Sequence, residues 1–408
     1  MDTRADRFPL FDSLRALAAL AVICSHIGSF GGVLLDGDAL RPYVGQLAVA
    51  VPIFLLISGF LLYRPFAAAR LRGRQRPSIP AYGWRRVLRI APAYWVAVTL
   101  ITIWLGSNYL FHGGTQPIEV FSERGLLAYY GFTQLYSADT RGGAIPQAWT
   151  VDTEVAFYLA LPLYALLVFW LLRRYGMRWR GELALLGGVM VWSLLYKLVV
   201  VEADDMRAVP VTPLPLLSSL PAYVDHFALG MALAVVSVAV AESRRELRFV
   251  DVIERRPWLP WLVAAVAFWA VSTQIGMEGS PVELMTTEQY FERHVLYAVI
   301  ALGMLLPAVF GDHRSGWVRH LLGNRALLHF GMVSYGVYLW HLAWIIQLVH
   351  WDLGSHEVLG PWLTWLPIVV GGAWVMGSLS YYIVERPALS LKRLVPDRRP
   401  APSPEPAP

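Results

Sequence analysis

The stretch FDSLRALAALAVICSH, residues 11–26, places two ionisable side chains in an apolar run. Arg15 and His26 are eleven positions apart. That spacing is about 20° past three helical turns, so both side chains share one helix face, separated by about 16 Å along the axis. A charge in hydrocarbon costs roughly 2.5–3.5 kcal/mol on insertion scales, so ionisable side chains inside a membrane usually have a function. His26 is therefore a candidate proton acceptor, and Arg15 a candidate anion ligand. The alternatives are an arginine that snorkels to the headgroups and a histidine at the outer interface.

A second group of cations lies in YGWRRVLRIAPAYW, where Arg86 and Arg89 are three positions apart and share a helix face. Guanidinium groups bind phosphate oxygens in a bidentate manner, so this pair is a candidate phosphate site. An anchor at the membrane surface is the alternative. For Arg85, which points to another face, the anchor explanation suffices.

Two carboxylates enter an apolar segment in IPQAWTVDTEVAFYLALP. They are Asp152 and Glu154, and Tyr158 follows Glu154 by one helical turn. A carboxylate inside a membrane faces a partner or a cavity. It either forms an ion pair that holds helices together, or it orients the imidazole of His26 or binds a substrate hydroxyl.

Three further polar residues lie in apolar segments, and their roles stay open. His341, in VSYGVYLWHLAW, fits a hydrogen-bonded core histidine or a substrate contact. Asp225 and His226, in PAYVDHFALGM, either line an acceptor pocket or pair with neighbouring groups. Aromatic residues that either stack on sugar rings or belong to an interface belt are Tyr129, Tyr130, Tyr136 and Trp149.

The composition indicates which kind of protein positions these groups. Of 408 residues, 56% are hydrophobic and only 15% are charged, and the mean hydropathy is +0.48. A chain with so few charges is typical of an integral membrane protein. The single cysteine, Cys24, excludes an intramolecular disulfide and a cysteine-based metal cluster. The sequence contains no Walker A loop, no GxGxxG after a strand and no HExxH, so we expect no metal and no bound cofactor.

Windows of about 20 apolar residues predict an all-α bundle of about ten transmembrane helices. The windows are approximately 10–29, 46–64, 84–106, 149–172, 183–202, 218–241, 258–276, 293–311, 330–351 and 361–385. A further run, Leu126 to Leu135, is too short to span. Arginines concentrate in alternate loops, whereas loop 277–292 is acidic, so the positive-inside rule predicts that both termini are cytoplasmic. The net charge of +5 therefore reflects topology, and we expect contact with the lipid bilayer of the inner or plasma membrane and none with nucleic acid.

The sequence predicts one membrane domain, residues 1–390, and a disordered tail, residues 391–408. No small-x-small cleavage motif follows the first apolar run, so we expect a retained helix. The tail contains the Pro-rich segment PDRRPAPSPEPAP, whose composition is typical of disorder.

Five motifs in order resemble the membrane acyltransferase-3 family: FDSLRALAALAVICSH, RRVLRIAPAYW, AWTVDTEVAFYLALP, SYGVYLWH and YYIVERP. The resemblance covers about residues 9–389. It implies an enzyme that transfers an acyl group, commonly acetyl, from cytoplasmic acyl-CoA to a hydroxyl of an extracytoplasmic glycan or glycolipid. A membrane transporter of sugars or small amphiphiles, and a non-catalytic scaffold, are the alternatives.

The resemblance also suggests a role for each candidate residue. His26 is the expected general base, oriented by Glu154 or by Asp152, a charged residue at a position where the family pattern has a less charged one. Arg86 and Arg89 are expected to bind the phosphates of CoA, with Arg15 deeper in the membrane. Expected substrate contacts are Trp149, Tyr158, Asp225 and His341.

Overall fold

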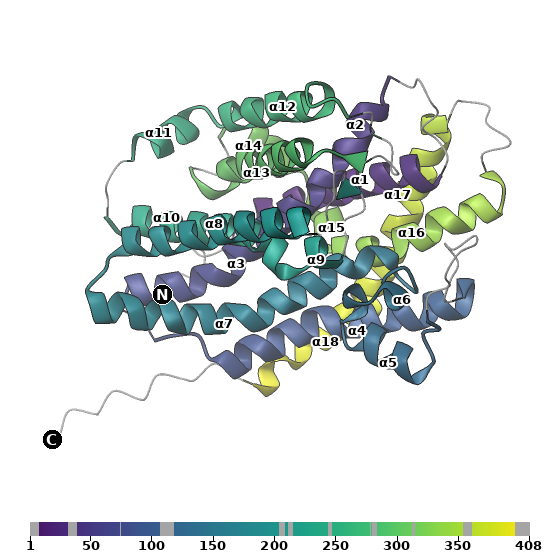
Figure 1. Cartoon of the computed structure of the whole chain (residues 1–408), viewed down its shortest axis with the longest axis horizontal. Helices are drawn as coiled ribbons and strands as arrows, with labels where there is room; N and C mark the ends of the chain where they lie inside the picture. Colours follow the sequence, from purple (N-terminus) through teal and green to yellow (C-terminus); the bar gives the residue numbers. More distant parts are fainter. Residues whose placement is uncertain are drawn as a thin grey trace.

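The protein, seen here as a computed structural model, is built almost entirely from helices, and most of the long ones run roughly along the horizontal axis of the view (Figure 1). The structure describes residues 8–31, 39–73, 75–106, 118–203, 209–210, 215–243, 247–277, 279, 284–311, 315–353 and 361–395. The long helices are α1 (Leu10–Phe30), α3 (Ala50–Leu71), α4 (Ile79–Leu105), α7 (Trp149–Tyr175), α8 (Trp179–Ala203), α10 (Leu220–Ser243), α12 (Trp258–Thr273), α13 (Thr287–Val309), α16 (Ser334–His350) and α17 (Pro361–Ser380).

Shorter elements connect and flank these helices. They are α2 (Arg41–Gly45), α5 (Glu123–Tyr130), α6 (Ala138–Arg141), α9 (Pro215–Ser218), α11 (Arg248–Arg255), α14 (Trp317–Leu322), α15 (Arg325–Met332) and α18 (Arg386–Ser390). The 3-10 helices are Gln46–Val49, Gln134–Tyr136, Pro146–Ala148 and Leu391–Leu394, and a π-helical turn, Tyr381–Glu385, joins α17 to α18. The strands β1 (Val209–Pro210) and β2 (Leu284–Met285) pair antiparallel, with Val209 opposite Met285.

Each of the ten predicted windows overlaps with one of the long helices, which confirms the all-α membrane architecture. Among the described residues, 8 helices are long and apolar enough to cross a bilayer. The pair α15–α16 passes the same test when taken together but bends by 75°, and α12, with 16 residues, is shorter. The run Leu126 to Leu135 forms α5 and part of a 3-10 helix, neither of which spans.

Two parts of the sequence analysis fall outside the described residues: the tail from residue 396, and the acidic loop positions Glu278 and Glu283. Residues 391–394 are described and form a 3-10 helix, so regular structure continues past residue 390. The cytoplasmic location of the termini stays a prediction.

Helix ends set the positions of the polar side chains along α4 and α13. Ser78 caps α4, with its side chain accepting a hydrogen bond from the Ala81 amide at 3.5 Å. Because α4 starts there, Arg86 and Arg89 lie in its second and third turns. Thr286 and Gln289 form a capping box at the start of α13.

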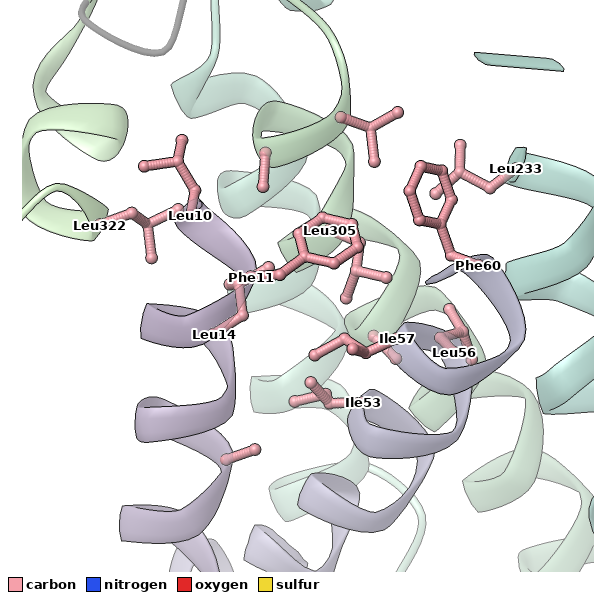
Figure 2. Packing of buried hydrophobic residues seen from close by; sticks show 14 of the residues in the cluster. Leu10, Phe11, Leu14, Ile53, Leu56, Ile57, Phe60, Leu233, Leu305 and Leu322 are labelled. Atoms are coloured by element: carbon pink, nitrogen blue, oxygen red, sulfur yellow. The ribbon is translucent and has the colours of Figure 1, made fainter. Parts of the chain in front are cut away.

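The largest core cluster packs α1 against α3 and α13 (Figure 2). The rings of Phe11 and Phe60 lie 5.1 Å apart at an angle of 59°, and Leu305 packs beside them. Leu14 of α1 is fully buried in the same cluster. This apolar face of α1 fixes the helix within the bundle, so that its polar side chains, Arg15 and His26, have defined positions.

Helices α3 and α10 approach closely through two glycines. A Cβ atom on Gly59 would lie 2.2 Å from the carbonyl oxygen of Phe227, and one on Gly230 would lie 2.1 Å from that of Leu56. Small residues allow backbones to touch inside a membrane, where packing rather than the hydrophobic effect holds helices together. The α3–α10 contact therefore requires glycine at both positions.

Candidate active site

A cavity of about 480 Å³ lies between α1, α3, α4, α7, α15, α16 and the C-terminal segment. Its polar lining residues are Asp12, Arg15, Ser58, Arg85, Arg86, Arg89, Thr150, Glu154, Tyr158, Ser334, Tyr335, Tyr338, Tyr381 and Lys392. The cavity is thus lined by the arginines Arg15, Arg86 and Arg89 and by Glu154, one of the three carboxylates that the sequence singled out. These groups come from segments far apart in the sequence, and the bundle brings them together.

Five cations line the cavity from the N-terminal parts of α1 and α4 and from the C-terminal 3-10 helix, and we call this part of the wall the cationic mouth: Arg15, Arg85, Arg86, Arg89 and Lys392. Arg15 pairs with Asp12 at 2.9 Å, and Arg89 pairs with Glu385 at 2.9 Å. The Arg86 guanidinium lies 5.7 Å from the centre of the Tyr158 ring, and its buried Nε has no hydrogen-bond partner. Contrary to the sequence interpretation of Arg85 as an anchor alone, its side chain also lines the cavity.

Glu154, on α7, lines the cavity. Its Oε1 accepts hydrogen bonds from the hydroxyls of Ser58 and Tyr158, both at 2.6 Å. The one-turn spacing of Glu154 and Tyr158 in the sequence therefore corresponds to a direct contact. Ser58, on α3, carried no sequence signal that distinguished it from other small polar residues in a membrane helix.

His26 pairs with the second intramembrane histidine. Its Nδ1 lies 2.8 Å from Nε2 of His341, and the planes of the two rings differ by 11°. Nδ1 of His341 lies 2.8 Å from the carbonyl oxygen of Tyr338 and 3.2 Å from that of Val337. His341 is fully buried, whereas His26 is partly exposed.

These contacts assign the proton positions in the histidine pair. A carbonyl oxygen only accepts, so Nδ1 of His341 carries a hydrogen and, in the neutral ring, Nε2 is an acceptor. His26 must then donate from Nδ1, which leaves its own Nε2 with a free lone pair. The arrangement presents a base at Nε2 of His26 and holds the ring in one orientation.

The pair lies beyond the end of the cavity opposite the cationic mouth. Val22, one turn before His26, lines the cavity, and so do Tyr338 and Thr150, whose hydroxyls lie 2.8 Å apart. His26 and His341 are not among the lining residues. The axial separation of Arg15 and His26 on α1 thus places a cation in the mouth and a base just past the far end.

Neither carboxylate orients His26 in the structure, which corrects the contact expected from the sequence. Glu154 bonds to Ser58 and Tyr158, as described. Asp152 is buried and its Oδ2 accepts from the amide of Leu135 at 2.8 Å. Asp152 therefore holds the segment that precedes α7, and the partner of His26 is another imidazole.

Asp225 also lies outside the cavity, in a buried ionic network that we call the Lys197 network. Lys197 Nζ lies 2.6 Å from Oδ2 of Asp225 and 2.7 Å from Nε2 of His294, and His226 bonds to the other carboxylate oxygen at 3.1 Å. This arrangement agrees with the second alternative of the sequence analysis, in which Asp225 and His226 pair with neighbouring groups and do not line an acceptor pocket. Lys197 was missed in the sequence because a single lysine near a helix end resembles an interfacial anchor.

The Lys197 network has the donor set of a metal site but carries its own cation. Ligand atoms of Asp225, His226 and His294 lie within 4.8 Å of one another. The ammonium group of Lys197, which is fully buried, sits against two of these three side chains. A metal ion would have to displace that ammonium from its partners, which would leave a buried charge unpaired.

The aromatic candidates divide into buried and accessible residues. Tyr129 is fully buried, and its hydroxyl donates to the carbonyl of Ile118 at 3.1 Å. Burial raises the pKa of Tyr129 to about 12, so it stays a neutral donor. Tyr136 is 52% exposed, and Trp149 is partly exposed with its ring 5.6 Å from that of Tyr223. Of these, Tyr136 and Trp149 can meet a sugar ring, and Tyr129 cannot.

Comparison with known proteins agrees with this architecture. Residues 9–381 match a family model described as Acyltransferase domain. The chain is 26% identical to Nodulation protein 10 of Rhizobium leguminosarum bv. viciae, over 95% of both chains. It is 24% identical to Acyltransferase MdmB of Streptomyces mycarofaciens, over 100% of this chain and 97% of that protein.

A third relative is longer than this chain. Putative peptidoglycan O-acetyltransferase YrhL of Bacillus subtilis (strain 168) is 23% identical over 93% of this chain but only 54% of its own length. The chain thus spans about half the length of that protein. No solved structure matches. The family model covers most of the helical bundle, including both histidines and the cavity wall up to Tyr381, and the chain belongs to this family of membrane acyltransferases.

Proposed function

We propose that the protein transfers an acetyl group from acyl-CoA to a hydroxyl of an extracytoplasmic glycan or glycolipid, with His26 as the general base. Family membership selects an acyltransferase over the transporter and the scaffold. The names of YrhL and of Peptidoglycan O-acetyltransferase OatA of Listeria monocytogenes support an acetyl group and a glycan hydroxyl. The predicted topology places the donor at the cytoplasmic face and the acceptor at the other.

The observation that carries the proposal is the free lone pair on Nε2 of His26, one helical turn beyond Val22 in the wall of a cavity with a cationic mouth. A hydroxyl is a poor nucleophile at neutral pH, so acyl transfer to it requires a base within hydrogen-bond reach. CoA is an anionic head on a long thin arm that ends in a thioester. Its phosphates suit Arg86 and the neighbouring cations, and its arm suits the part of the cavity that follows α1 from Arg15 to Val22.

In the proposed reaction Nε2 of His26 takes the proton of the acceptor hydroxyl while the oxygen attacks the acyl carbon. The new oxygen–carbon bond forms as the carbon–sulfur bond breaks, and the proton passes from His26 to the departing thiolate. His341 accepts the hydrogen bond from Nδ1 of His26 throughout, which keeps the base in one tautomer. Arg15, Arg86 and Arg89 bind phosphates, and Glu154, Tyr158 and Tyr338 line the path of the arm.

The direct test replaces His26 by alanine in the purified protein and measures acetyl transfer from acetyl-CoA. Loss of a general base lowers kcat by about 10²–10⁴-fold. Cys24→Ala is the matched control, since Cys24 lies on the same helix, two positions before His26, and does not line the cavity. Unchanged thermal unfolding of both variants excludes misfolding. Substantial transfer by His26→Ala would rule out His26 as the base.

The acceptor is identified separately. Mass spectrometry of cell-envelope glycans and glycolipids from a deletion strain should show loss of an acetyl mass, restored by the wild-type chain but not by His26→Ala. If His26→Ala also restored the acetyl mass, the proposed acceptor class would stand but His26 would not be the base.

A further inference from the structure

The C-terminal 3-10 helix, Leu391–Leu394, forms part of the wall of the cationic mouth. Lys392 lines the cavity, as does Leu389 just before this helix. The helix is held against α4 by a hydrogen bond of 3.0 Å from Nε1 of Trp84 to the carbonyl oxygen of Leu391. Trp84 lies two positions before Arg86, so this bond brings Lys392 to the part of α4 that carries the arginines.

The cations of the mouth differ in how much of their charge is already neutralised. Arg15 and Arg89 each have a carboxylate partner, Asp12 and Glu385 respectively, at 2.9 Å. Lys392 and Arg86 appear in none of the ion pairs found among the described residues. They extend from two different elements into one cavity, so uncompensated positive charge comes from two walls of the mouth.

We propose that Lys392 binds a phosphate of the acyl donor, as a second cationic pole beside Arg86. The proposal rests on the proposed function and adds a residue to its site for the donor phosphates. Two poles on separate walls suit a donor that carries more than one phosphate group, as the nucleotide of CoA does, and they give no advantage to a thioester without phosphates. Lys392 lies beyond residues 9–381, the part of the chain that the family model matches.

The test compares Lys392→Gln with Arg393→Gln in the full-length protein reconstituted in vesicles. Arg393 is the matched control because it is the next residue of the same helix, is exposed and does not line the cavity. The donors are acetyl-CoA and S-acetylpantetheine, which has the arm and the thioester but no phosphate. Donor KM and kcat are measured at low and at moderate ionic strength.

Lys392→Gln should raise the KM for acetyl-CoA about fivefold at low ionic strength, the size expected for one exposed ion contact, and less when salt is added. Its kcat and its KM for S-acetylpantetheine should stay at the wild-type values. Lys392→Arg should restore the KM for acetyl-CoA, and Arg393→Gln should leave every parameter unchanged. A uniform rise in KM for both donors, or an equal effect of Arg393→Gln, would overturn the proposal.

Binding of CoA without turnover separates this proposal from the proposed function. CoA should raise the thermal unfolding temperature of the wild type and of His26→Ala equally, and that of Lys392→Gln less. If Lys392→Gln weakens this effect while His26→Ala still transfers acetyl groups, the Lys392 proposal stands and the base assignment fails. If wild type uses acetyl-CoA and Lys392→Gln has the wild-type KM, the Lys392 proposal alone fails. Absence of any effect of CoA on the wild type refutes both.

Discussion

Replacement of His341 tests whether one imidazole orients another. In His341→Leu the side chain keeps a similar volume, but Nδ1 of His26 loses its acceptor at 2.8 Å. A free imidazole divides itself between two tautomers and several ring orientations, and only one combination presents a lone pair at Nε2. The lost hydrogen bond is worth about 0.5–1.5 kcal/mol, and the lost orientation adds to it. We expect kcat to fall about 10–100-fold, equivalent to about 1.4–2.8 kcal/mol in the barrier.

The assay is steady-state acetyl transfer by purified His341→Leu, His341→Gln and His350→Ala, with thermal unfolding measured on each. The glutamine variant can still accept from His26 through its amide oxygen, so it should retain more activity than the leucine variant. His350 is an exposed residue on the same helix and should be replaceable without effect.

The double variant of His26 and His341 gives the strictest test of the orienting role. Once His26 is absent, His341 has nothing to orient, so His26→Ala/His341→Leu should be no slower than His26→Ala alone. Additive losses in the double variant, or a His341→Leu enzyme within twofold of wild type, would refute the orienting role.

Two further predictions concern stability, measured by thermal unfolding of the detergent-solubilised protein. Gly59→Val places a Cβ atom 2.2 Å from the backbone oxygen of Phe227 and should lower the unfolding temperature strongly. Gly187→Ala, with nothing within 4 Å of the added atom, should leave the unfolding temperature unchanged. Equal effects of the two substitutions would contradict close packing of α3 and α10. Lys197→Met leaves the buried carboxylate of Asp225 without its cation, and breaking such a pair typically costs about 3–5 kcal/mol. A Lys197→Met protein as stable as the wild type would show that the ion pair does not stabilise the bundle.

Much of this protein could be predicted because the bilayer restricts what a spanning segment can be. Apolar windows of helical length predicted all ten long helices. The shared face of Arg15 and His26 required only helical geometry, and the one-turn spacing of Glu154 and Tyr158 anticipated their contact.

The contacts between helices could not be predicted in the same way, because they depend on how the bundle packs. The spacing along α7 does not reveal that Asp152 bonds to the amide of Leu135, since that segment folds back only in the tertiary structure. Likewise, His26 and His341 are separated by 315 positions, and nothing local to either residue indicates the other. Lys392 lies next to a Pro-rich tail, and the composition of that tail gave no indication that Lys392 lines the cavity.

The unequal lengths of the helices have a consequence for the surrounding lipid. Helix α12 has 16 residues and is about 24 Å long, less than the roughly 30 Å of a hydrocarbon core, whereas α4 has 27 residues and is about 40 Å long. Large apolar side chains of α12 such as Leu262, Val266 and Trp269 are exposed at its surface. A hydrophobic segment shorter than the hydrocarbon core is accommodated by local thinning of the bilayer or by snorkelling of flanking residues. We therefore expect the lipid beside α12 to form a thinner layer than the lipid beside α4.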